Sequence, residues 1–200
     1  KIASCDWIIE VVVERLDIKQ SVFEQIEKFR KPGTLITSNT SGIPIHFMSE
    51  GRSEDFQKHF CGTHFFNPAR YLKLFEIIPG PQTSSEVLDF LTIYGEKFLG
   101  KTSVVAKDTP GFIFNYLLLA LTGAAVRLLE NGVASAEDID KSMTLGLGHP
   151  IGPLALADFN GLDVGYMVGR AMYERSKDPC LAPSTILKEL VDSGRLGRKT

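Results

Sequence analysis

The sequence has no marked excess of charge of either sign. It contains 22 Lys and Arg against 24 Asp and Glu, a formal net charge of −2 at pH 7. Basic and acidic residues are interspersed along the whole chain. A general binder of nucleic acid or of an anionic membrane surface needs a field of one sign. The charge balance therefore predicts no nucleic-acid partner and no membrane association of that kind.

Cysteines are few and widely spaced. Cys5, Cys61 and Cys180 are odd in number and show neither a CxxC spacing nor a dense disulfide framework. We therefore expect reduced thiols in an intracellular protein, located in the cytoplasm or, alternatively, in the mitochondrial matrix. The histidines show no metal-ligand spacing either, so no metal site is expected.

Long apolar runs are also missing. The most apolar stretch, residues 112–126, is interrupted by Asn115 and Thr122 and falls short of the ~20 residues that span a bilayer. It predicts a buried helix. The chain opens with KIASCDWIIE, without an initiator Met or a signal-peptide pattern, so we expect it to start inside a longer protein.

Strand and helix patterns alternate in the first half of the chain. Strands are predicted at 6–13, 34–41, 61–66, 73–80 and 101–108, and helices at 16–29 and 84–100. This alternation is typical of an α/β domain. Sheets in such domains carry ligands at the carboxyl ends of their strands, so residues 38–42 form a candidate functional loop.

The pattern becomes helical from Thr109 onward. Thr109 and Pro110 fit the N-cap and N1 positions of a long apolar helix that ends near Glu130. Ser135 is predicted to cap a further helix, with Asp138 at the N3 position. Helical spacing continues through 153–177 and 184–193. We therefore predict two domains, an α/β domain over 1–108 and an all-helical domain over 109–200.

The most informative stretch is HFFNPARYLKLFEIIPG, residues 64–80. A strand period of two places His64 beside Phe66, and Glu76 beside Leu74 and Ile78, so both polar groups share apolar faces. A carboxylate on such a face needs a partner, and a histidine one strand away is a natural one. A histidine held by a carboxylate can remove a proton from an alcohol near neutral pH. The alternative is a core histidine with a structural ion pair.

Other polar residues also occupy suggestive positions. Ser41, at a strand end, and Asn115, near a helix start, could each bind a substrate oxygen; equally, they could be a turn former and a capping or interhelix group. Glu14 and Lys19 lie between the first strand and its helix, where a carboxylate is favoured by the helix dipole without any ligand.

These motifs together resemble one family. SNTS, HFFNP, a glutamate twelve residues after the histidine, DTPGF with a nearby asparagine, and HPIGPLALADFNGLD are similar to the L-3-hydroxyacyl-CoA dehydrogenase family, including its 3-hydroxybutyryl-CoA members. The resemblance covers essentially the whole chain. It implies an NAD-dependent oxidoreductase that interconverts L-3-hydroxyacyl-CoA and 3-ketoacyl-CoA in fatty-acid β-oxidation or butyrate-type metabolism.

The resemblance also implies roles for individual residues. His64 would be the general base and Glu76 its electrostatic partner. Ser41 and Asn115 would bind the oxygens of the acyl-CoA substrate. Glu14, Lys19, Ser41 and Asn67 would line the nicotinamide and ribose side of NAD. The helical domain would form much of a homodimer interface.

The sequence departs from the family pattern in two places. No GxGxxG turn occurs in it, although the family opens with a strand and such a turn, whose amides bind the dinucleotide pyrophosphate. We therefore expect an incomplete Rossmann-type dinucleotide-binding domain followed by an all-α dimerisation domain, in a chain truncated at its N-terminus. Tyr116 also stands where the family usually has an arginine.

Two other functions were weighed. A β-hydroxyacid or phosphogluconate-type dehydrogenase also joins a dinucleotide domain to a helical one, but relies on a lysine motif that the helical half lacks. A noncatalytic acyl-CoA-binding or oligomerisation module of the same fold is favoured by the missing glycine turn. The intact His64 and Glu76 argue against it.

Overall fold

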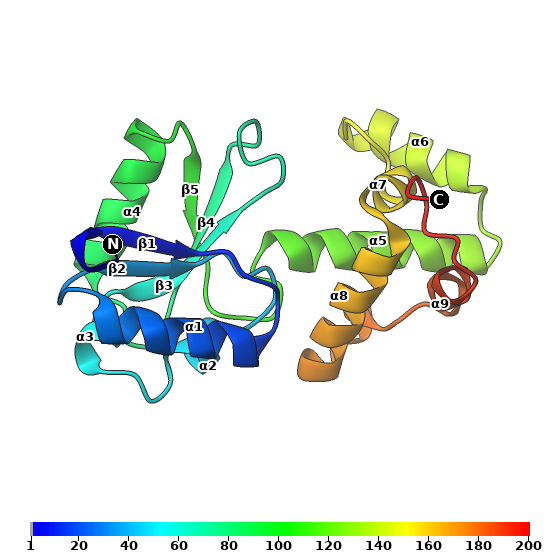
Figure 1. Ribbon diagram of the computed structural model, residues 1–200. Coiled ribbons are helices and arrows are strands. Elements are labelled where there is room, and N and C mark those ends of the chain that lie inside the picture. Colours follow the sequence, from blue (N-terminus) through cyan, green and yellow to red (C-terminus); the bar gives the residue numbers. More distant parts are fainter. Residues whose placement is uncertain (1) are drawn as a thin grey trace. The chain divides into compact units, whose positions relative to one another are not determined.

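The computed structural model describes residues 2–200. The chain folds into two compact units, the first ending at Phe112 and the second spanning Ile113–Thr200. The first unit is an α/β layer structure and the second is helical (Figure 1). An α/β half followed by a helical half is the fold class that the sequence predicts.

The first unit is built on one mixed sheet. Its strands are β1 Trp7–Glu10, β2 Leu35–Ser38, β3 Phe60–Phe65, β4 Leu74–Pro79 and β5 Thr102–Val105, and they lie side by side in that order. Strands β1, β2 and β3 are mutually parallel, whereas β4 runs antiparallel to β3 and parallel to β5. The carboxyl ends of β1, β2 and β3 therefore meet at one edge of the unit.

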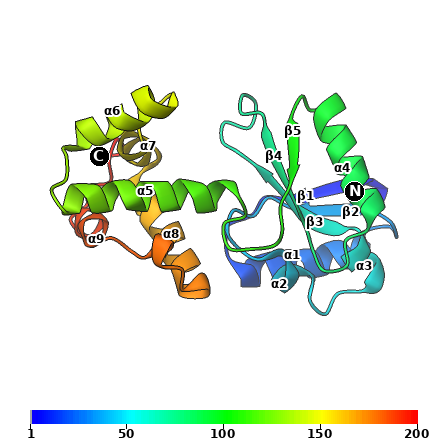
Figure 2. The same ribbon diagram turned by 180° about the vertical axis from the view of Figure 1, so that it is seen from behind.

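Helices cover both faces of this sheet. Helices α1 Leu16–Phe29, α2 Ile45–Ser49 and α3 Glu54–Lys58 lie on one face, and α4 Ser85–Lys97 lies on the other (Figure 2). The first face packs around Phe23, Phe56 and Phe60, and the second around Phe75 and Leu91. The range predicted for α1 is confirmed, whereas α2 and α3 were not predicted because each has only five residues.

The second unit is all helical. Its helices are α5 Phe114–Glu130, α6 Ala136–Leu147, α7 Pro153–Asn160, α8 Leu162–Ser176 and α9 Thr185–Asp192, with a short 3₁₀ helix, η2 Pro179–Leu181. Ser135 caps α6 as predicted, because its hydroxyl accepts a hydrogen bond from the Asp138 amide at 3.1 Å. Within residues 2–200, no helix is both long and apolar enough to span a membrane.

The start of α5 differs from the prediction. The helix begins at Phe114 and not at Thr109. Gly111 and Phe112 both have positive φ, 78° and 53°, a left-handed conformation that cannot propagate a right-handed helix. Residues 110–113 form a turn instead.

We expect opposite effects from two Gly-to-Ala substitutions in helices. A Cβ on Gly95 in α4 would lie 2.9 Å from both Phe75 Cδ1 and Ser103 Oγ, whereas a Cβ on Gly165 in α8 would meet nothing within 4 Å. Gly95→Ala should therefore lower the free energy of unfolding by about 1–3 kcal/mol, and Gly165→Ala should raise it by roughly 0.5–1 kcal/mol. Urea denaturation measures both. A stabilised Gly95→Ala variant would contradict the close packing of α4 on the sheet.

Candidate active site

A buried histidine and a buried glutamate face each other near the carboxyl end of β3. His64 and Glu76 are directly opposite in the β3–β4 register, and both side chains are buried, as expected from the apolar strand faces on which periodicity places them. His64 Nδ1 lies 2.8 Å from Glu76 Oε2, and the two side chains are 4% and 1% exposed. Because a carboxylate oxygen only accepts hydrogen bonds, this contact places a proton on Nδ1 and leaves Nε2 available as a base.

The other ring nitrogen points to a hydroxyl. Ser41 Oγ lies 3.1 Å from His64 Nε2. The rings of Phe66 and Phe112 pack against the imidazole, with centroid distances of 4.3 and 5.7 Å. The imidazole is thus oriented by a carboxylate and a hydroxyl and is surrounded by apolar rings. That environment suits a group that exchanges a proton with a bound alcohol.

Ser41 belongs to a loop, residues 39–43, that follows β2; we call it the Ser41 loop. Glu14 Oε1 accepts hydrogen bonds from the backbone amides of Ser41, Gly42 and Ile43 at 3.0, 3.0 and 3.3 Å, and from the Thr40 hydroxyl at 2.5 Å. The Glu14 side chain remains 43% exposed. One carboxylate therefore binds four consecutive residues of the loop.

The Glu14 carboxylate and the buried Lys19–Glu10 ion pair behind this loop compensate one another's charges. Desolvation opposes ionisation of Glu14, but the Thr40 hydrogen bond, the nearby Lys19 ammonium and the loop amides outweigh it, so the pKa of Glu14 lies below its ordinary value. Lys19 is fully buried, and its Nζ lies 2.9 Å from both oxygens of Glu10. Ser38 at the end of β2 donates to Glu10 Oε2 at 2.6 Å.

The structure brings four of the predicted site residues together, whereas Asn67 and Asn115 belong to other segments of the chain. Ser41, His64 and Glu76 are joined by hydrogen bonds, and Glu14 joins them through the Ser41 loop. Asn67 is exposed and lies two residues after the end of β3. Asn115 belongs to the second unit, where it lies in the first turn of α5.

Sequence reasoning missed several contacts that build this edge of the sheet. The Asn39 side chain accepts a hydrogen bond from the Phe65 amide at 2.9 Å and so ties the Ser41 loop to β3. Asp108 accepts hydrogen bonds from the amides of Ile45 and His46 at the start of α2. No local pattern reveals these pairs, which are separated by 26 or more residues.

Metal binding and thiol chemistry find no support in the described residues. Within residues 2–200, no cluster of three or more His, Cys, Asp or Glu side chains could hold a metal ion. Burial raises the pKa of the Cys61 thiol, so this thiol is inert as a nucleophile.

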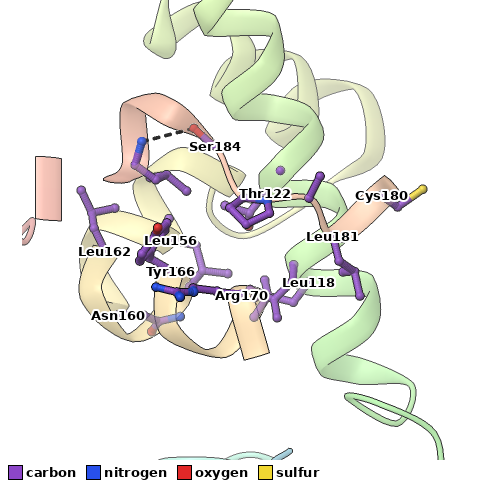
Figure 3. Close-up of a pocket in the computed structure, with 18 of the residues that line it drawn as sticks. Leu118, Thr122, Leu156, Asn160, Leu162, Tyr166, Arg170, Cys180, Leu181 and Ser184 are labelled. Atoms are coloured by element: carbon purple, nitrogen blue, oxygen red, sulfur yellow. Dashed lines mark hydrogen bonds between the residues drawn. The ribbon is translucent and has the colours of Figure 1, made fainter. Parts of the chain in front are cut away.

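The second unit contains a separate cavity of about 80 Å³. Leu118 and Thr122 of α5 and Leu156 of α7 line it together with Tyr166 and Arg170 of α8 (Figure 3). Its walls are mainly apolar, and they bring together no acid, base and nucleophile. We assign this cavity no catalytic role.

We predict that loss of the Glu76 carboxylate destabilises the fold. Glu76→Ala removes one partner of a buried pair and leaves the His64 Nδ1 proton without an acceptor, which should cost about 3 kcal/mol of unfolding free energy. Glu174→Ala is a matched control, because Glu174 pairs with Arg170 on the surface of α8 and should change stability by less than about 0.5 kcal/mol. Equal effects of the two substitutions in urea denaturation would contradict this burial argument.

Comparison with known proteins identifies both parts of the chain. The model of the 3-hydroxyacyl-CoA dehydrogenase NAD binding domain matches residues 1–109, and the model of the 3-hydroxyacyl-CoA dehydrogenase C-terminal domain matches residues 111–200. The human protein named "Hydroxyacyl-coenzyme A dehydrogenase, mitochondrial" is 40% identical over 98% of this chain and 62% of its own length.

Solved structures agree with the sequence matches. The crystal structure of (S)-3-hydroxybutyryl-CoA dehydrogenase from Ralstonia eutropha superposes with a TM-score of 0.92 at 38% identity, covering 99% of this chain and 69% of that one. The chain spans between 26% and 70% of the length of the first curated relatives that it matches. With both domain models matched in order, the chain belongs to the 3-hydroxyacyl-CoA dehydrogenase family.

Proposed function

We propose that the protein containing this chain interconverts L-3-hydroxyacyl-CoA and 3-ketoacyl-CoA, with NAD as the redox partner. The observation that carries the proposal is the hydrogen-bonded chain Ser41–His64–Glu76, with His64 and Glu76 buried, near the carboxyl ends of β2 and β3. The family match to an NAD binding domain over residues 1–109 supports the cofactor. Alcohol oxidation requires a base for the hydroxyl proton, and His64 is such a group.

The first unit offers groups that fit the nicotinamide and ribose part of NAD. The half-exposed Glu14 carboxylate, which binds the Ser41 loop, and the exposed Asn67 amide, two residues after β3, can form hydrogen bonds with ribose hydroxyls or with a carboxamide. They lie where α/β sheets bind cofactors, beyond the carboxyl ends of parallel strands. Bound NAD supplies the hydride acceptor for alcohol oxidation. The resemblance also assigns Lys19 to this side, and its ammonium lies 3.4 Å from Glu14 Oε2.

His64 carries the proton in this mechanism. In the oxidative direction, Nε2 accepts the proton of the C3 hydroxyl as the C3 hydride leaves. Glu76 keeps the Nδ1 proton in place and stabilises the imidazolium that forms. In the reductive direction, the imidazolium returns the proton to the developing alkoxide.

Ser41 and Asn115 complete the proposed substrate site. The Ser41 hydroxyl, which contacts Nε2 in the structure, can turn its hydrogen bond to the substrate oxygen once that oxygen reaches His64. Asn115 would bind a second substrate oxygen from the helical domain. Both roles are inferred from the family resemblance.

The assembly and the cellular compartment are part of the same proposal. We infer a homodimer formed through the helical domain, because α5, α6 and α8 expose large apolar side chains, among them Leu117, Leu145 and Met167 at 61%, 85% and 67%. Three free cysteines and a mitochondrial human relative support an intracellular site, either the cytoplasm or the mitochondrial matrix.

His64→Gln should abolish most of the activity. We expect the full-length protein to oxidise NADH in the presence of acetoacetyl-CoA, and the substitution to lower kcat by ~100-fold or more, as for a lost general base. The absorbance of NADH at fixed protein concentration measures the rate. His59→Gln is the matched control, because His59 lies at the end of α3 and contacts Asp55.

Two outcomes would contradict the proposal. A folded, full-length wild-type protein that is inert toward acetoacetyl-CoA would favour the noncatalytic acyl-CoA-binding module. A His64→Gln variant as active as His59→Gln would remove His64 from the reaction.

A further inference from the structure

Lys19 is the most deeply buried cation at the candidate site. Its side chain is 1% exposed, although lysine is among the residues least often buried. The ammonium lies 2.9 Å from both Glu10 oxygens and 3.3 Å from the Val12 carbonyl oxygen. Three oxygen atoms of the first unit thus surround the ammonium, which has three protons to donate. Lys19 is therefore fixed in one position.

Glu10 is fixed as tightly as Lys19. Besides the ammonium, its carboxylate accepts hydrogen bonds from the Ser38 hydroxyl at 2.6 Å and from the Val12 amide at 2.5 Å. A buried carboxylate with several donors and one cation has one stable geometry, because any rearrangement leaves a charge unpaired in the protein interior. The pair thus fixes Lys19 Nζ at the carboxyl ends of β1 and β2.

The fixed ammonium in turn constrains Glu14. Lys19 Nζ lies 3.4 Å from Glu14 Oε2. The other oxygen, Oε1, accepts the four hydrogen bonds of the Ser41 loop. Glu14 therefore joins a buried cation on one side to three consecutive backbone amides on the other. Such a set of convergent amides is a typical anion-binding arrangement, here filled by a side chain of the same chain.

The Ser41 loop carries this constraint to the histidine. Its Ser41 hydroxyl contacts His64 Nε2 at 3.1 Å. A shift of Glu14 would release the amides of Ser41 and Gly42 and so change the position of that hydroxyl. Effects of this kind matter because catalytic geometry must be held to well under 1 Å.

We propose that Glu10, Lys19 and Glu14 act as positioning residues that hold the Ser41 loop, and through it the Ser41 hydroxyl, against His64. Lys19 acts on the loop through Glu14. That this positioning serves catalysis rests on the proposed function. The positioning itself can be measured without an activity assay.

Backbone amide hydrogen exchange tests whether Glu14 and Lys19 hold the Ser41 loop. Glu14→Gln and Lys19→Met, introduced into the full-length protein, should each lower the protection of the Ser41 and Gly42 amides by at least about tenfold, because hydrogen bonds to a charged acceptor are lost or weakened. Glu24→Gln and Lys28→Met are matched controls, since they remove the same charges from exposed positions of α1. They should leave these amides unchanged.

A double variant separates positioning from stability. Lys19→Met alone leaves Glu10 buried without its cation and can unfold the protein. Glu10→Gln/Lys19→Met removes both charges and should restore a folded protein, because loss of a whole buried pair is nearly neutral. The Ser41 loop should stay unprotected in the double variant, since Glu14 still lacks its cation.

The imidazole resonances of His64 supply a second readout. In Glu14→Gln, the NMR signals of the His64 ring should shift toward those of Ser41→Ala, because both variants weaken the same Oγ contact. In the kinetic assay kcat should fall while Glu24→Gln stays at the wild-type rate. Wild-type loop protection and wild-type His64 signals in folded Glu14→Gln and in the double variant would overturn the proposal, whatever the protein's activity.

Discussion

Charge compensation at the carboxyl ends of the strands is the constraint on which this site depends. Glu10, Lys19 and Glu76 are each at most 3% exposed, and an isolated buried charge would cost several kcal/mol. Each therefore needs a fixed partner. Lys19 holds Glu10, and the Nδ1 proton of His64 is accepted by Glu76.

The two pairs meet in the Ser41 loop. Lys19 reaches the loop through Glu14, and His64 reaches it through the Ser41 hydroxyl. The loop is thus held from both sides, by backbone amides and by a side chain. A proton acceptor that is oriented in this way needs little reorganisation when substrate arrives, which is the general advantage of a preorganised site.

The sequence predicts the layers of the fold and the central pair, because both follow from short-range periodicity. The strand period placed His64 and Glu76 on inward faces, and the helical period gave the bounds of α1. The predicted start of α5 at Thr109 was wrong, because positive φ at Gly111 and Phe112 prevents a helix from running through these residues.

The buried role of Lys19 was not predictable from sequence. The family resemblance assigns it to the cofactor side, and only the tertiary structure shows its buried contacts with Glu10 and Val12. The link from Asn39 to β3 escapes prediction for the same reason, since its partner amide is 26 residues away. Hydrogen bonds between distant segments leave no periodic pattern in a sequence.

A crystal structure of the full-length protein with NAD and acetoacetyl-CoA tests the central claim most directly. The quantity of interest is the distance from His64 Nε2 to the C3 oxygen of the substrate. The account predicts a hydrogen bond of about 2.6–3.2 Å, with Nδ1 still bound to Glu76. A substrate oxygen that is bound elsewhere, with His64 still paired only to Ser41 and Glu76, would contradict it.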